Sequence, residues 1–145
     1  MSDRALRIGI AALALAGFGV AGYLTYVHYA EVTPVCAVAH GCEKVQTSHW
    51  AVLAGIPVAV LGLVGYGAIL ASLAVPGEAG RLAGAALALA GFGFSAYLTY
   101  LEVIEIEAIC AWCVASAVLM TALAALALVR LLRNSLGTIQ EAATR

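Results

Sequence analysis

Long apolar stretches are the feature that most limits how this chain can fold. A helix needs about 20 mostly apolar residues to cross a lipid bilayer. Four stretches of the 145-residue sequence meet this requirement: residues 6–29, 51–75, 82–101 and 109–132. Hydrophobic residues make up 64% of the chain and charged residues 10%, whereas soluble domains average about 45–50% and about 25%. The sequence therefore predicts an all-α membrane protein, a single domain over residues 1–145 that forms a bundle of four transmembrane helices.

The distribution of basic residues predicts how this bundle is oriented. Six arginines flank the apolar stretches on the side of the two termini: Arg4, Arg7, Arg81, Arg130, Arg133 and Arg145. The positive-inside rule then places both termini in the cytoplasm, in a multi-pass protein of the cytoplasmic (inner) membrane. The large first extracytoplasmic loop covers residues 30–50. A net charge of -1 offers no basic surface for nucleic acid, so membrane lipid is the expected surrounding.

Part of the first apolar stretch recurs in the third. Residues 11–26, AALALAGFGVAGYLTY, match residues 85–100, AALALAGFGFSAYLTY, at 13 of 16 positions. The same offset of 74 carries Cys36 onto Cys110. Chance matching of Ala and Leu could explain the first half of the match, but the shared GFG and YLTY favour a repeat. Because the first and third spans cross the bilayer in the same direction, the two copies are expected to be parallel.

Four cysteines share the predicted extracytoplasmic side, where disulfides form and persist. Cys36 and Cys42 lie in the large loop, and Cys110 and Cys113 form CAWC at the start of the fourth stretch. Residues three apart on a helix are neighbours, and the exposed N–H groups of a helix start favour a thiolate. The apolar flanks put the CAWC pair at the bilayer boundary, within reach of a lipid-soluble electron carrier. The loop pair can meet a soluble protein, so the two pairs predict an electron relay.

Other interpretations of the cysteines stay open at this point. The four could form two structural disulfides that staple a small membrane protein. A zinc site is also conceivable, although its spacing matches none of the usual finger patterns, so no metal is expected; its ligands would be Cys36, His40, Cys42 and His49. A small transporter is a third alternative, but the spans contain almost no ionisable residues to build a pathway.

The arrangement resembles the vitamin K epoxide reductase family. The shared pattern is a C-x5-C loop after the first helix, Ser48 shortly before the second, and CxxC at the opening of the fourth. The stretch CEKVQTSHW followed by GIPVA resembles the same region of bacterial homologues, and the resemblance extends from about residue 5 to residue 133. It implies a membrane enzyme that takes electrons from a thioredoxin-like or DsbA-like extracytoplasmic protein and passes them to a quinone, which supports disulfide bond formation. The fused thioredoxin-like domain of many bacterial homologues is not among these residues, so a separate partner is expected.

The resemblance also implies a role for individual residues. Cys36 would exchange with the thioredoxin-like partner, Cys42 would exchange with Cys110, and Cys113 would face the quinone. Ser48 would support the site by hydrogen bonding, in a short segment that covers the helix bundle. Alternatively, Ser48 is only a helix N-cap.

Two positions depart from the family's vertebrate members. There, an Asn on the second helix and a Tyr one turn after CxxC hydrogen-bond the quinone or epoxide. The matching positions here are Val58 and Ala117, both apolar. We therefore expect reduction of a quinone, such as menaquinone, ubiquinone or a vitamin K analogue, and not of an epoxide. A DsbB-like quinone reductase would perform the same chemistry with CxxC in its first outer loop, whereas this chain has CxxC on the fourth helix.

Overall fold

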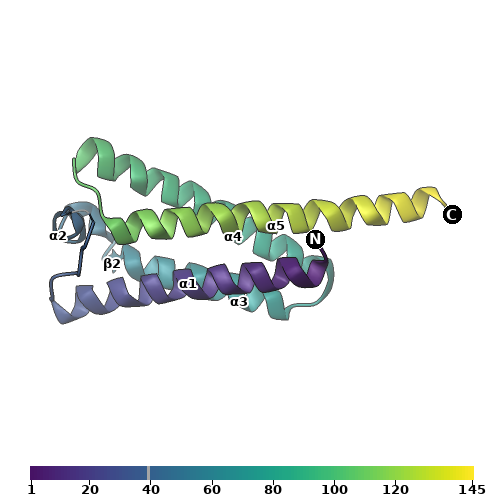
Figure 1. Cartoon of the computed structure of the whole chain (residues 1–145), viewed down its shortest axis with the longest axis horizontal. Coiled ribbons are helices and arrows are strands. Elements are labelled where there is room, and N and C mark those ends of the chain that lie inside the picture. The colour runs from purple at the N-terminus through teal and green to yellow at the C-terminus, as the bar shows by residue number, and fades with distance from the viewer. Residues whose placement is uncertain (39) are drawn as a thin grey trace.

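The computed structural model describes residues 1–38 and 40–145 and contains a bundle of long helices (Figure 1). The bundle consists of α1 (Asp3–Ala30), α3 (Val58–Ala74), α4 (Gly77–Tyr100) and α5 (Ala111–Ala143). Both termini lie at one end of it, and the segment between α1 and α3 lies at the opposite end. That segment includes the short helix α2 (Cys42–Gln46). Ala39, within the predicted loop, lies outside the described residues.

Small residues let the helices of the bundle approach closely. α1 packs on α3 and α5, and α4 packs on the same two helices. The buried core between them is rich in alanine, with a few larger side chains: Ile10, Ala14, Ala21, Tyr66, Ile69, Ala85, Ala88, Met120, Leu123, Ala124 and Ala127. The two copies of the repeat use their GFG alike, since Gly17 lies against Tyr66 and Gly91 lies against Met120. The small side chains of the repeat therefore form helix-packing surfaces.

The predicted bundle of apolar helices is confirmed, whereas the number of spans and the cytoplasmic location of the termini stay predictions. α1, α5 and the continuous helix over Gly77–Glu105 are long and apolar enough to cross a membrane. α3 is apolar but has 17 residues, which corresponds to about 25 Å of helix. Its N-terminal boundary was predicted wrongly. Residues 51–57 belong to the 3-10 turn η1 (His49–Ala51) and to a hairpin of β1 (Val52–Leu53) and β2 (Ile56–Pro57).

The chemistry of one turn explains the late start of α3. Ala54 and Gly55 connect β1 and β2 with φ angles of 51° and 83°, which a helix does not allow. Pro57 follows and serves as the N-cap of α3, and the residue before a proline avoids helical backbone angles. The apolar pattern therefore continues through a segment that is not helical.

Two other predicted boundaries also move. The fourth helix was expected to end at residue 132, but α5 continues to Ala143. Its apolar pattern indicates the length that can cross a bilayer, and polar helix-forming residues extend it further. The third helix was expected to end at residue 101, but α4 continues as the π-helix η2 (Leu101–Glu105).

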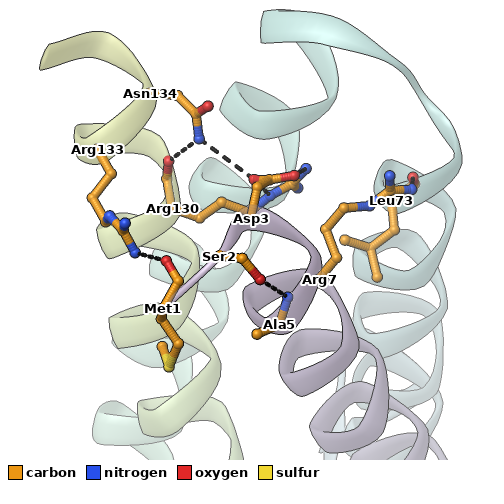
Figure 2. A network of polar contacts seen from close by, with 9 residues as sticks. All are labelled: Met1, Ser2, Asp3, Ala5, Arg7, Leu73, Arg130, Arg133 and Asn134. Carbon is orange, nitrogen blue, oxygen red and sulfur yellow. Dashed lines mark hydrogen bonds and ion pairs between the residues drawn. The ribbon is translucent and has the colours of Figure 1, made fainter. Parts of the chain in front are cut away.

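Polar contacts tie the N-terminus to the rest of the bundle at the end that carries the termini (Figure 2). The Arg130 guanidinium donates to the Asp3 carboxylate from Nε at 2.8 Å. Arg7 donates to the carbonyl of Leu73, at the C-terminal end of α3, at 2.9 Å. These contacts gather basic side chains at this end of the bundle, in line with the charge asymmetry of the sequence.

Candidate functional site

The end of the bundle opposite the termini holds the loop cysteines. Cys36 and Cys42 form a disulfide with their Cα atoms 6.3 Å apart. Cys42 is the first residue of α2 and is 1% exposed, whereas Cys36 is half-buried. The outer end of the disulfide is therefore accessible while its inner end lies within the protein.

Side chains from two helices hold the backbone next to Cys36. The Tyr23 hydroxyl of α1 accepts a hydrogen bond from the Val35 N–H at 3.0 Å. The Trp112 indole of α5 donates from Nε1 to the Val35 carbonyl at 2.8 Å. The rings of Tyr23 and Trp112 also pack together, with centroids 4.9 Å apart. The position of Cys36 relative to α5 is thus fixed by contacts to the residue before it.

The CxxC pair lies at the start of α5, as the sequence predicts. Cys110 is the N-cap residue in an extended conformation, Cys113 lies in the first turn, and both are free thiols. Cys42 and Cys110 are buried in one apolar cluster, against which Cys36 and Cys113 pack. The structure therefore brings all four predicted cysteines together.

The two free thiols influence each other. The Cys113 thiol hydrogen-bonds to the sulfur of Cys110 and lowers the pKa of Cys110 to about 7, although burial acts in the opposite direction. The amide of Gln46 adds a weaker contribution. Its Nε2 lies 3.9 Å from Cys110 Sγ and 3.6 Å from Cys113 Sγ. The sequence predicted a thiolate from the N–H groups of the helix start. The backbone N–H of Cys113 does lower the pKa of Cys110, but the neighbouring thiol is the larger cause.

A buried carboxyl group completes the surroundings of the pair. Glu102 lies in η2 and is only 5% exposed. Its Oε2 accepts a hydrogen bond from the backbone N–H of Cys110 at 3.2 Å, and its carboxyl group also contacts the Cys113 thiol. Glu102 was not singled out from the sequence, because it follows the third apolar stretch directly and precedes two further glutamates, Glu105 and Glu107.

A cavity borders the cysteine cluster inside the bundle. It is lined by α1, α3, α4, α5 and the segment before α3, and has a volume of about 160 Å³. Its walls are mostly apolar and include Val58 and Ala117, with Cys113 and Ser48 among the polar residues. The other polar lining residues are His28, Gln46, Tyr66, Ser95, Thr99, Glu102 and Ser116.

Hydrogen bonds orient two of these polar residues. The Ser48 hydroxyl donates to the carbonyl of Val45 at 2.7 Å. Ser48 is the N-cap residue of η1, but its side chain makes no capping hydrogen bond. The Tyr66 hydroxyl, from α3, donates to the Ser116 carbonyl of α5 at 2.9 Å. Gln46 and Tyr66 were not singled out from the sequence, where only the position of Gln46 four residues after Cys42, one helical turn, could have indicated its role.

Comparison with known families supports the interpretation of this site. A family model described as the vitamin K epoxide reductase family matches residues 8–128. The match covers most of the chain and includes all four cysteines, Ser48 and the cavity between the helices. Together with the apolar helices, it indicates a membrane protein with oxidoreductase activity, to which a disulfide beside two free thiols is suited. The chain belongs to the vitamin K epoxide reductase family.

Proposed function

We propose that this protein is a membrane thiol oxidoreductase that passes two electrons from a thioredoxin-like or DsbA-like partner to a quinone. One observation carries the proposal: the loop disulfide packs against Cys110, while Cys113 borders the cavity. The cluster thus connects the half-buried Cys36 at the loop to a largely apolar space inside the bundle. Oxidation of the partner makes the reaction a source of disulfide bonds.

Electrons reach the inner pair by two thiol–disulfide exchanges. A thiolate of the partner attacks Cys36, and the second partner thiol resolves the mixed disulfide, which leaves Cys36 and Cys42 reduced. Cys42 then attacks Cys110 of an oxidised CxxC pair, and Cys36 resolves that bond. The products are a loop disulfide and two thiols at Cys110 and Cys113. This is the pairing found in the structure, so it corresponds to the state that is ready to deliver electrons.

The cavity residues fit a quinone headgroup as electron acceptor. A quinone supplies a ring that accepts two electrons and two protons to become a hydroquinone. Val58 and Ala117 would provide apolar walls, the Gln46 amide beside Cys113 would donate to a carbonyl oxygen, and Ser48 would support the segment through its hydrogen bond to Val45. Val58 and Ala117 carry no hydrogen-bonding side chain, so the reaction is assigned to a menaquinone, ubiquinone or vitamin K analogue and not to an epoxide.

The proposed topology has four spans with both termini in the cytoplasm of the inner membrane. The gathering of Arg7 and Arg130 at the end of the bundle with the termini supports it. α3, with 17 residues, is at the short limit for a spanning helix, about 17–25 residues. The cysteine cluster would then face the extracytoplasmic side, where an oxidising environment keeps disulfides.

Quinone reduction by the purified protein tests the proposal. Wild type in detergent micelles is mixed with a reduced DsbA-like protein and a menaquinone or ubiquinone analogue, and compared with Cys113→Ala. Val114→Ala is the matched control, because Val114 is the next residue on α5 and its side chain is exposed. We expect turnover in wild type and control and none in Cys113→Ala.

The opposite result has a definite meaning. Wild type that reduces none of these quinones would overturn the proposal. If its loop disulfide also resists glutathione-range reductants, the alternative of a small membrane protein with structural disulfides would be favoured.

A further inference from the structure

Glu102 lies between two spaces in the protein. One is the cavity inside the bundle, which Cys113 also lines. The other is an open cleft beside the loop, lined by His40, Gly41, Lys44, Glu102, Val103, Glu107, Ala108 and Ile109. Among the described residues that line these two spaces, Glu102 is the only one that borders both.

The carboxyl group of Glu102 also touches both residues of the CxxC pair. It accepts a hydrogen bond from the N–H of Cys110 and contacts the Cys113 thiol. Glu102 occupies a π-helical turn, an irregularity that occurs often at functional sites. Its side chain is 5% exposed, and burying a carboxyl group is costly. A carboxyl group kept there beside a thiol is suited to exchange a proton with it.

The proposed reaction uses protons inside the cavity, but the transfer of electrons from the loop does not carry protons there. Thiol–disulfide exchange proceeds through thiolates, so protons of the partner's thiols are released to water at the loop. Formation of the Cys110–Cys113 disulfide releases two electrons, and a hydroquinone needs two protons with them. These protons must reach an apolar cavity that the loop and helices cover. A titratable group that borders both the cavity and the outer cleft can supply them.

We propose that Glu102 transfers protons between the outer cleft, the Cys113 thiol and the quinone. This inference rests on the function proposed above. When the Cys110–Cys113 bond forms, Glu102 takes the proton of Cys113 and gives it to one quinone oxygen. It then takes a second proton from the outer cleft, which replaces the one that Cys110 has lost to water, and gives it to the other oxygen. Two electrons and two protons thus leave the thiol pair and its surroundings and arrive on the quinone.

Several titratable groups line the same two spaces as Glu102. In the cavity they are His28, Tyr66 and Cys113, and in the cleft His40, Lys44 and Glu107. Cys110 contacts Glu102 through its backbone N–H. Glu105 belongs to the same π-helix, but its side chain is exposed. Glu105 therefore provides a control that has the same charge and the same helix but no contact with the thiols.

The test compares wild type with Glu102→Gln and Glu105→Gln. A glutamine at position 102 keeps an oxygen that can accept from the Cys110 N–H, but it cannot carry a proton. The value of kcat for quinone reduction should fall roughly 100-fold in Glu102→Gln, because general acid–base groups contribute about 10²–10⁴-fold. It should stay at the wild-type value in Glu105→Gln.

A second measurement needs no quinone and separates proton transfer from a structural role. The thiolate of Cys110 is titrated by its ultraviolet absorbance in protein with the CxxC pair reduced. Because the Glu102 carboxylate opposes a negative charge on Cys110, its removal should lower the pKa of Cys110. Glu102→Gln should therefore form the thiolate more readily and yet reduce quinone more slowly, a combination that misfolding does not produce.

Each other outcome overturns a defined part of the argument. Wild-type turnover in Glu102→Gln would refute the proton-transfer role and leave the proposed function intact. The same holds for an unchanged thiolate titration, or for an equal loss in Glu105→Gln. Wild type that reduces no quinone would refute the proposed function, and with it the destination of the proton.

Discussion

Replacement of Gly17 by alanine tests how closely α1 and α3 pack. A Cβ atom at position 17 would lie 2.6 Å from Cδ1 of Tyr66 and closer still to Cε1 and Cζ of the same ring. The ring is rigid and only 1% exposed, so it cannot move without disturbing its neighbours. Its displacement would also break the hydrogen bond from the Tyr66 hydroxyl to the Ser116 carbonyl.

The expected cost follows from these two losses. Overpacking of a well-packed core costs about 1–3 kcal/mol, and a lost hydrogen bond about 0.5–1.5 kcal/mol. Gly17→Ala should therefore be less stable than Gly19→Ala by about 1.5–4.5 kcal/mol. Gly19 is the matched control because it lies on the same helix with no atom within 4 Å of its Cβ position, so the change in helix propensity cancels.

The free energy of unfolding in mixed micelles, measured by titration with sodium dodecyl sulfate, checks this difference. Gly91→Ala should fall between the two variants. Its Cβ would meet the flexible thioether of Met120, at 2.7 Å from Sδ, and methionine adapts more easily than a tyrosine ring. Unfolding free energies of Gly17→Ala and Gly19→Ala that agree within about 0.5 kcal/mol would refute the argument from close packing.

Two further predictions concern the thiols and the loop. Because the Cys113 thiol lowers the pKa of Cys110 to about 7, the thiolate dominates above this pH, and exchange with the loop disulfide should slow as the pH falls below it. In Cys113→Ala the pKa of Cys110 should rise toward its ordinary value, and an unchanged midpoint of thiolate absorbance would contradict this cause. Trp112→Phe removes the donor to Val35, a loss of about 0.5–1.5 kcal/mol, and glutathione should reduce the loop disulfide up to about tenfold faster than in wild type. Trp50→Phe, an exposed position, is the control, and equal reduction rates in the two variants would speak against the anchoring role of Trp112.

The helices could be predicted because apolar length and charge spacing follow directly from the bilayer. Their ends could not, since an apolar pattern does not distinguish a helix from the hairpin that precedes α3. Gly55 and Pro57 did indicate an interruption before α3. They act through the backbone angles, which a search for apolar residues does not detect. The extension of α5 past residue 132 was not predicted either, because polar residues also form helices and the apolar pattern ends before them.

The site was predictable where its chemistry depends on residue type and local spacing. CxxC at a helix start and a loop pair with five intervening residues are visible in the sequence, and the structure brings the two pairs together. Glu102 was not predictable in this way, because its burial depends on the π-helical turn and on the position of α5. Gln46 and Tyr66 act across helices, and no local pattern shows which long-range neighbours a side chain will meet.

The repeat has a consequence for the electrical character of the cavity. The offset of 74 that relates its two copies also relates His28 to Glu102, and both residues line the cavity. Two helices with nearly the same sequence thus present an imidazole from α1 and a carboxyl group from the end of α4. The cavity is therefore chemically asymmetric, although the two helices that supply these groups have similar sequences. A ring bound in the cavity would have both an imidazole and a carboxyl group in its lining.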